Sequence, residues 1–363
     1  MKRSFVFLSV AIIVLSCNKE TDDFLWEKSY GPGTAYFIRS LPDSGIISCG
    51  TLNGYPYLLK LKKDRTVESE FTFEKEGLFS SAWSGTSRYI AAGSSDGKML
   101  LAFISTKGNL LWDTLIAASF RIRMTSLVSS GSGSFTAVGT ARSDSIESGT
   151  SGILFVRFDS TGFIGERKET AEASFVAAGK VTSDASGNIL LPLTRKKLTS
   201  EPLASIAKYS GELNKLWETE LCNNTSFGAA SLDAIADDAG NAYIAGTTEV
   251  TSADSVLKSS FLAALTSSGT VKWKKYLEKT NSGTAIILDD NELLMMLNIN
   301  CFIVNMANTE DGTDEGRIRM FEVCDPKSTD AFGEDLDIYY DGSLIVAGTR
   351  AGNYYLALES YIQ

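Results

Sequence analysis

A repeated unit constrains the fold of this chain more than any other feature. The unit is an apolar strand, a tight polar turn and a second strand ending in a small residue, Gly and Thr or Ser; its clearest copy runs from Asp237 to Thr247. The turns begin near positions 43, 85, 131, 184, 237, 289 and 341. A period of about 40–50 residues is typical of four-stranded propeller blades. The Asp, Asn and Gly residues of the turns support this fold, because they tolerate the positive φ that tight hairpins need.

The two ends of the chain indicate how the ring closes. Each copy continues with an apolar third strand and a fourth strand that often carries Trp, as at Trp112, Trp217 and Trp273. The last copy ends after its third strand, whereas residues 24–30 show the same pattern around Trp26. We therefore predict an all-β fold over residues 24–363, a seven-bladed β-propeller of four-stranded blades. Its N-terminal strand completes the last blade and removes two exposed sheet edges. A β-sandwich pair and a solenoid are the alternatives, and neither predicts a split last unit.

One stretch also resembles a known family. The sequence from Asp237 to Thr247, followed by an apolar strand and by Ser-Gly-Thr-Val-Lys-Trp at 268–273, resembles the bacterial beta-propeller repeat family abbreviated SBBP. The likeness is close over residues 232–277 and looser elsewhere. It implies an extracytoplasmic propeller without assigned chemistry. The element from Gly269 to Trp273 is also similar to repeats of quinoprotein dehydrogenases and of the lipoprotein that assists outer-membrane barrel assembly.

The N-terminus has the features of an export signal. Lys2 and Arg3 precede an apolar run at residues 5–15, which is shorter than the roughly 20 residues that span a bilayer and fits a signal peptide. Ser16 before Cys17 resembles the lipobox of bacterial lipoproteins, which implies cleavage before Cys17 and acylation of its thiol. An ordinary secretory signal is the alternative. We expect a signal peptide at 1–16 and a lipidated tether at 17–23, with more than one acyl chain giving stable anchoring.

The residues after Cys17 also suggest where the protein is located in the cell. Asn18 follows the cysteine instead of Asp, so the inner-membrane retention signal of the enterobacterial type is missing. The acidic residues Glu20, Asp22 and Asp23 resemble the export signals of surface lipoproteins of Bacteroidota. The expected location is the outer membrane, facing the periplasm or the cell surface.

Composition narrows the chemistry. The net charge of −10 argues against nucleic acid as a partner, because phosphate binding needs a basic face. The chain has no histidine, which removes the commonest general base and transition-metal ligand and excludes a His-based triad. The acidic turn around Asp311 and Asp314 lacks the ligand pattern of an EF-hand, so we read it as a solvated turn. No metal, cofactor or catalytic residue is predicted, and an enzymatic activity is left open.

The candidate binding face carries long connections between second and third strands, because long loops on a rigid scaffold are where binding usually occurs. These connections are residues 141–152, 195–202, which include the basic Arg195, Lys196 and Lys197, and 249–260. A recurring phenylalanine before the first strand of most blades falls on the same side. Packing between blades is the favoured interpretation of this series, and an aromatic ring at the channel mouth is the alternative. The series consists of Phe37, Phe79, Phe120, Phe175, Phe227 and Phe332.

Four cysteines remain after Cys17 in an oxidising compartment. Cys301 starts a third strand and Cys324 ends the following fourth strand, so reflection about a loop centred near 312 makes them cross-strand partners. We predict a candidate disulfide there. Cys49 and Cys222 are expected to be buried and unpaired.

These features favour a cell-envelope lipoprotein that acts as a non-catalytic binding scaffold for a protein or glycan. The alternatives are a subunit of an outer-membrane assembly or secretion complex and a carboxylate-based, glycan-active enzyme. A quinoprotein is disfavoured by the absence of adjacent cysteines.

Overall fold

The computed structural model describes residues 24–129, 133–140, 151–172, 175–196, 203–222, 229–252, 255–277, 282–298, 302–318 and 331–359. The regular elements in these ranges are all β-strands. No helix in the described part of the chain is long and apolar enough to cross a membrane.

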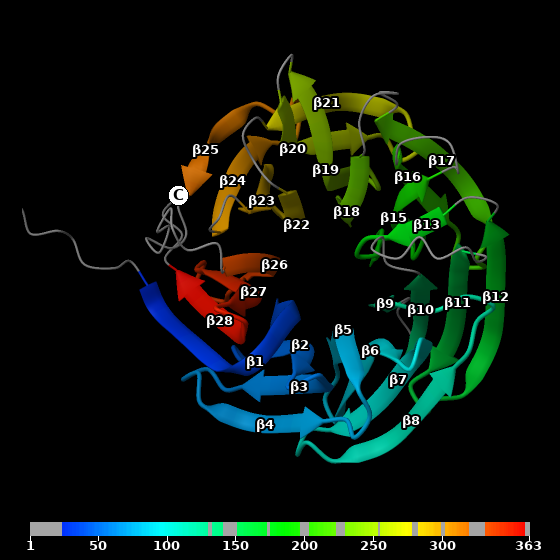
Figure 1. Cartoon of the computed structure of the whole chain (residues 1–363), viewed down its shortest axis with the longest axis vertical. Helices are drawn as coiled ribbons and strands as arrows, with labels where there is room; N and C mark the ends of the chain where they lie inside the picture. Colours follow the sequence, from blue (N-terminus) through cyan, green and yellow to red (C-terminus); the bar gives the residue numbers. More distant parts are fainter. Residues whose placement is uncertain are drawn as a thin grey trace, which may run out of the picture.

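The strands form six antiparallel hydrogen-bonded sheets, which stand around a central axis (Figure 1). The largest sheet has the order β26 (Ala331–Ile338), β27 (Leu344–Arg350), β28 (Asn353–Glu359), β1 (Phe24–Ser40), β2 (Ile46–Leu52), β3 (Tyr55–Leu61) and β4 (Val67–Thr72). The next two along the chain are β5 (Gly77–Ser84), β6 (Arg88–Ser95), β7 (Lys98–Ser105) and β8 (Leu110–Ile116), then β9 (Met124–Ser129), β10 (Ser134–Thr140), β11 (Ser151–Asp159) and β12 (Ile164–Glu172).

The other three sheets continue the ring in chain order. The first contains β13 (Phe175–Ala178), β14 (Thr182–Ser183), β15 (Ile189–Lys196), β16 (Leu203–Tyr209) and β17 (Lys215–Cys222). The second contains β18 (Ala229–Ala236), β19 (Ala242–Ser252), β20 (Ser255–Leu265) and β21 (Val271–Leu277). The third contains β22 (Ser282–Asp289), β23 (Glu292–Asn298), β24 (Phe302–Asn308) and β25 (Asp314–Ile318).

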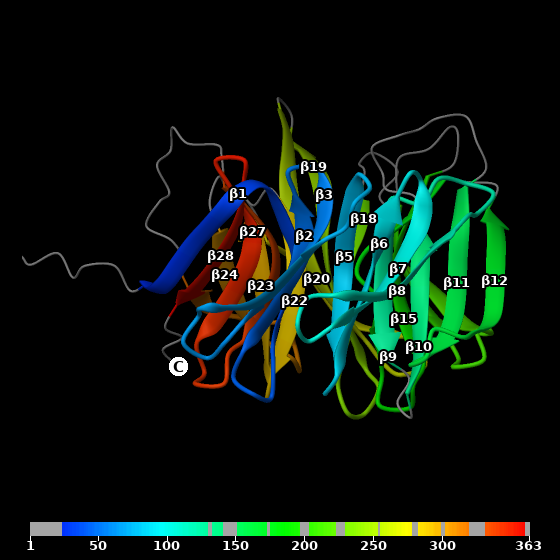
Figure 2. The ribbon, with the colours of Figure 1, turned by 90° about the horizontal axis from the view of Figure 1, so that it is seen from below.

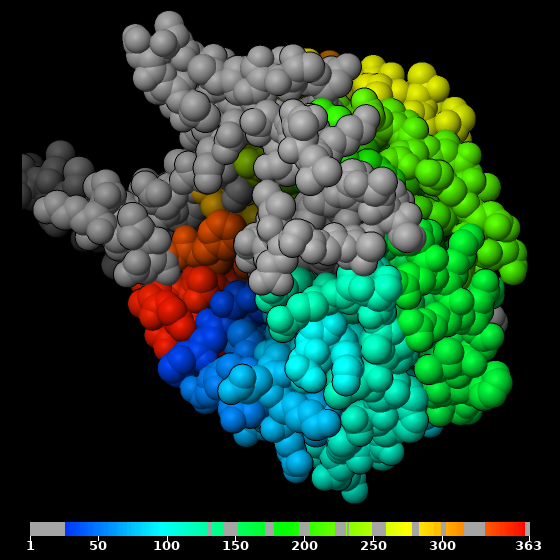
Figure 3. Space-filling view, turned by 45° about the vertical axis from the view of Figure 1, so that its right-hand side comes forward, coloured from blue at the N-terminus to red at the C-terminus, as the bar shows by residue number. Residues whose placement is uncertain are grey.

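Strand β1 links the two ends of the chain. Its first half pairs with β28, from Phe24 opposite Glu359 to Pro32 opposite Asn353. Its second half pairs with β2, from Gly33 opposite Leu52 to Ser40 opposite Ile46. The N-terminal strand therefore lies beside the last strand, as the sequence predicts, and Figure 3 shows the blue and red ends of the chain in contact.

The recurring glycine of the repeat has a steric cause. A Cβ added at Gly50, Gly93 or Gly348 would lie 2.0, 1.9 or 2.1 Å from a carbonyl oxygen of the neighbouring innermost strand. The innermost strand has a register shift beside each of these glycines, for example between Phe79 and Ser81. Such a bulge brings the two backbones together, so only glycine fits in the second strand.

The fourth-strand tryptophans connect neighbouring sheets. Trp217 on β17 donates from its indole Nε1 to the Ser267 carbonyl in the next sheet, at 3.0 Å, and its ring covers Gly269 in that turn. Trp273 on β21 repeats the contact with the Thr309 carbonyl at 3.0 Å. Each Trp thus covers the turn between the third and fourth strands of the following sheet. This contact explains why turn glycine and Trp recur together in the sequence.

Candidate functional site

The innermost strands surround a polar cavity in the central channel. The cavity has a volume of about 320 Å³ and is lined by residues of β1, β5, β9, β14, β18 and β22 and of the segment between β13 and β14. Its lining includes Trp83, Ser129 and Ile235, which lie near the ends of their strands. The cavity therefore extends toward the side of the turns that join first and second strands. It also includes Phe37, Arg39, Ser126, Lys180 and Asp233.

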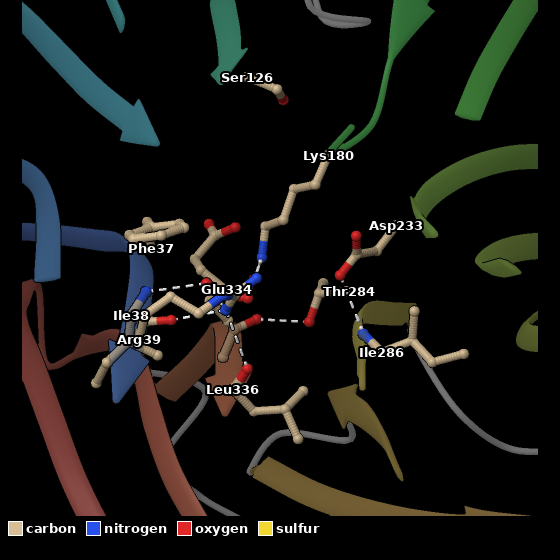
Figure 4. A network of polar contacts seen from close by, with 12 residues as sticks. Phe37, Ile38, Arg39, Ser126, Lys180, Asp233, Thr284, Ile286, Glu334 and Leu336 are labelled. Atoms are coloured by element: carbon tan, nitrogen blue, oxygen red, sulfur yellow. Dashed lines mark hydrogen bonds and ion pairs between the residues drawn. The ribbon is translucent and has the colours of Figure 1, made fainter. Parts of the chain in front are cut away.

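A buried ionic network spans this channel (Figure 4). Lys180 lies between β13 and β14, and its Nζ reaches Asp335 Oδ1 on β26 at 3.0 Å and the Glu334 carbonyl. Arg39 Nη1 on β1 donates to Asp335 Oδ2 at 3.1 Å. The same Oδ2 accepts the Ile38 amide at 2.9 Å. Asp335 is only 1% exposed, so one buried carboxylate holds three parts of the ring together.

Asp233 occupies the equivalent position on β18. Its Oδ2 accepts the Ile286 amide of the next sheet at 3.0 Å, and its Oδ1 accepts the Ala234 amide at 2.8 Å. Among the described residues Asp233 forms no ion pair. Burial raises the pKa of Asp233 to about 7, although the nearby Lys180 ammonium opposes the rise. Burial likewise raises the pKa of Asp337, whose Oδ2 accepts the Ser40 amide at 2.7 Å.

The raised pKa of Asp233 makes stability depend on pH. The folded state holds the proton more tightly than the unfolded state, so this carboxyl lowers the free energy of unfolding as pH rises from about 4 to about 7. Asp233→Asn should remove this dependence of stability on pH. Between pH 4 and pH 7 the free energy of unfolding of the variant, relative to that of wild type, should therefore rise by up to about 4 kcal/mol. Urea unfolding at several pH values measures the effect. Parallel profiles for the two proteins would contradict it.

Shorter side chains make similar links around the channel. Ser81 Oγ accepts the Leu127 amide at 3.2 Å, and Ser126 Oγ accepts the Val181 amide at 3.2 Å. Thr284 donates from Oγ1 to the Gly333 carbonyl at 2.7 Å. Each bond joins the innermost strand of one sheet to the innermost segment of the next. The polar lining of the channel therefore has a structural role at most positions, and Asp233 differs from the serines by its charge.

The predicted phenylalanine series does not share one position in the fold. Phe37 lies opposite Cys49, Phe79 lies opposite Gly93 and Phe332 lies opposite Thr349. These partners fall before, at and after the recurring glycine, respectively. The expected recurrence at one repeat position is therefore not what the register shows.

The surroundings of these rings differ as well. Phe37 and Phe79 are buried in one cluster between β1–β4 and β5–β8, and Phe120 is buried in the next cluster, between β5–β8 and β9–β12. Phe332 is 37% exposed. Phe175 starts β13, but its side chain lies outside the described residues, as does Phe227.

The long connections are placed only in part. Arg195 on β15 forms a bidentate ion pair with Glu218 on β17, its Nη2 lying 3.0 Å from Oε2. The Lys196 side chain, Lys197 and residues 141–150 lie outside the described residues. Residues 249–260 are a correction: we expected a loop, but β19 and β20 stay paired as far as Ser252 opposite Ser255. Figure 2 shows this hairpin rising above its neighbours.

The remaining predicted sites have few described atoms. Cys17, Cys301 and Cys324 lie outside the described residues, and Cys222 is described only as the end of β17. Cys49 is a free, buried thiol. In the acidic turn, Asp311 Oδ1 accepts the Thr313 amide at 2.8 Å. The described residues contain no group of three His, Cys, Asp or Glu side chains that could hold a metal ion.

Comparisons with known proteins identify the fold class. The chain superposes on the β-propeller domain of Cps50 (Swd1) from Myceliophteria thermophila with a TM-score of 0.59 and 9% identity, covering 93% of this chain and 100% of that one. For Saccharomyces cerevisiae Sqt1 the TM-score is 0.52, with 10% identity and coverage of 94% and 100%. BamB from Moraxella catarrhalis aligns with a TM-score of 0.43, 11% identity and coverage of 88% and 82%, which supports no further argument.

No protein-family model matches the chain, and no curated protein does. The resemblance of residues 232–277 to one repeat family therefore gains no support from a family model. The two propeller structures are about 10% identical to this chain in sequence, so the similarity shows the fold alone. The chain is a β-propeller repeat protein.

Sequence reasoning missed the channel network. Asp233 and Asp335 each stand directly after a register shift, opposite Ala245 and Ala347. Each is followed thirteen residues later by the recurring glycine, Gly246 or Gly348. An aspartate at a fixed offset before the recurring glycine was the available signal.

Proposed function

We propose that this chain is a lipid-anchored, seven-bladed β-propeller of the outer membrane that acts as a non-catalytic binding scaffold for a protein partner. The seven-blade count follows if the two halves of β1 belong to different blades. The half that pairs with β28 is then the fourth strand of the last blade, and the half that pairs with β2 is the first strand of the first blade.

Strand direction supports an orientation for the anchored protein. Phe24 lies opposite Glu359, at the end of β28 remote from the connection between β27 and β28. Strand β1 therefore begins at the outer edge of the ring (Figure 1), beside the end of β28 that is farther from the connections between second and third strands. The long connections join second and third strands and lie on the other side. A tether attached before Phe24 would present them away from the membrane.

The β19–β20 hairpin is the observation that carries the choice of a protein partner. Beyond Thr248 opposite Ser259, no other described strand pairs with either of its strands. On a projecting hairpin, strand edges that pair with no described strand can accept a strand of another protein. A glycan would gain little from exposed strand edges, so the hairpin favours protein.

Shortening this hairpin tests the proposal. Because Thr248 and Ser259 are direct partners, residues 249–258 can be replaced by Asn-Gly, which forms a two-residue hairpin turn. We expect the melting temperature to change little, since the seven residue pairs from Ala242–Leu265 to Thr248–Ser259 remain. Co-purification of the partner from gently solubilised membranes should fall at least tenfold. Mass spectrometry of bound proteins measures it.

The matched control changes the opposite side of the ring. Glu310→Lys alters an exposed residue of the turn between β24 and β25 and should leave the bound proteins unchanged. Equal recovery of partners by the shortened variant and wild type would contradict the proposal, as would the absence of any stoichiometric partner in wild type.

Anchoring is tested separately at Cys17. Cys17→Ser removes the thiol that acylation requires, so the protein should shift from the membrane fraction to the soluble fraction. The N-terminal peptide of wild type should begin at Cys17 and carry the mass of its acyl chains. An unmodified N-terminal peptide in wild type would overturn the anchor while leaving the propeller intact.

A further inference from the structure

The two equivalent aspartates of the channel differ in their cations. Asp335 accepts the Ile38 amide and is neutralised by Lys180 and Arg39, at 3.0 and 3.1 Å. Asp233 accepts the corresponding amide of Ile286 at 3.0 Å and forms no ion pair with any residue that the structure describes. The same structural link is therefore made once by a carboxylate with two ion-pair partners and once by a carboxylate that forms no ion pair with a described residue. The backbone link alone does not require a carboxylate, because Ser81 and Ser126 make it with hydroxyl groups.

Asp233 also faces open space. The side chain is buried within the protein, at 6% exposure, yet it lines the cavity of about 320 Å³. Figure 4 shows it across the channel from the paired cluster of Lys180 and Arg39. Each of its oxygens accepts one amide, which leaves a further lone pair on each for a donor in the cavity.

Lys180 and Arg39 also line the cavity, where both pair with Asp335. The uncharged part of the lining suits the stem and head of an aliphatic amine. Phe37 and Trp83 offer aromatic surface, which packs against methylene groups and attracts cations. Ser126 lines the same cavity, and its hydroxyl oxygen can accept a hydrogen bond. At about 30 Å³ for each water, the cavity has room for several heavy atoms of a ligand.

We propose that the channel cavity binds a primary ammonium group on an aliphatic stem, with the Asp233 carboxylate as its counter-ion. Two sources share this chemistry: a free alkyl amine and the lysine side chain of a peptide. The ligand enters from the side of the turns between first and second strands, where Trp83 and Ile235 line the cavity. The site lies on the opposite side from the β19–β20 hairpin and does not depend on the function proposed for that hairpin.

Calorimetric titration of the detergent-solubilised full chain tests the site. The probes are pentylamine, its uncharged analogue pentanol, and N-acetyl-lysine methylamide. We expect pentylamine to bind saturably and at least tenfold more tightly than pentanol. Tighter binding of the lysine derivative than of pentylamine would assign the site to peptide side chains, and weaker binding would assign it to free amines. Equal binding of pentylamine and pentanol, or no saturable binding of pentylamine, would overturn the proposal.

Two variants that each remove one negative charge then show which carboxylate binds the ligand. Asp233→Asn should weaken pentylamine binding at least tenfold. Asp238→Asn makes the same change in an exposed turn of the same sheet and should bind like wild type. Unchanged binding by a folded Asp233→Asn variant would overturn the assignment to Asp233. If that variant does not fold, the comparison of amine with alcohol in wild type still decides whether the cavity selects a cation.

The pH dependence adds a further readout. The charged groups that act on Asp233 are Lys180 and Arg39, which lower its pKa, and Asp335, which raises it. Because the pKa of Asp233 is raised to about 7, the affinity for pentylamine should increase about tenfold from pH 6 to pH 8. The Asp233→Asn variant should show no such increase. A pH profile that is the same in both proteins would contradict the role of Asp233.

Discussion

Replacing Asp335 by alanine is expected to lower the free energy of unfolding by about 3–5 kcal/mol, the usual loss when one partner of a buried charge pair is removed. The substitution leaves the Lys180 ammonium, 15% exposed, without its carboxylate. It also leaves the Ile38 amide without the acceptor that joins β26 to β1. Arg39 loses less, because its side chain is 39% exposed. Urea unfolding at pH 7 measures the change.

Two further variants separate charge from packing. Asp335→Asn keeps an acceptor for the Ile38 amide but removes the charge, so its loss should be smaller than that of alanine. Asp238→Ala removes an acidic residue from an exposed turn and should change stability by less than about 0.5 kcal/mol. A loss below about 1 kcal/mol for Asp335→Ala would show that the channel network does not hold the ring together.

Gly93→Ala is expected to cost about 3 kcal/mol, at the upper end of overpacking effects. The new Cβ would lie 1.9 Å from the Leu78 carbonyl oxygen and 2.7 Å from the Phe79 Cα. Both are backbone atoms of β5, which is paired with β6 on either side of the register shift. Relief of the clash would therefore require breaking ladder hydrogen bonds. Thermal or urea unfolding compares the variant with wild type.

Gly165→Ala provides the matched control. Gly165 lies in β12, and a Cβ there meets no atom within 4 Å. The substitution also reduces the entropy of the unfolded chain, so stability should stay equal or rise slightly. Similar losses at Gly93 and Gly165 would mean that close approach of backbones is not why glycine recurs in this repeat.

The sequence predicts the framework of this protein because its signals are local. The turn of Asp237 and Asn241 closes through two hydrogen bonds between these residues, both 2.8 Å long, and it recurs at Asp184 and Asn188. The fourth-strand position of Trp and the pairing of residues 24–30 with β28 follow from the same periodicity. Each of these features depends on residues close together within one repeat, or on the count of repeats.

The features that escaped prediction depend on distant or subtle contacts. Lys180 and Asp335 are 155 positions apart, so no sequence spacing brings them together. The β19–β20 hairpin extends through a segment whose tip is rich in Ser, Thr and Asp, residues that are typical of turns. The phenylalanines are not spaced by the repeat: relative to the residue opposite the recurring glycine, Phe37 lies two positions after, Phe79 at that position and Phe332 one position before.

Hydrogen exchange of the β28 amides tests the central claim, that β1 closes the ring, most directly. If β1 pairs with β28 as the register indicates, Leu356 and Leu358 lie opposite Lys28 and Trp26 and are covered on both sides. Their peptide should then exchange as slowly as β7, which lies between β6 and β8. Exchange of β28 as fast as that of the outer strand β8 would show an open edge at this blade and would contradict a closed ring.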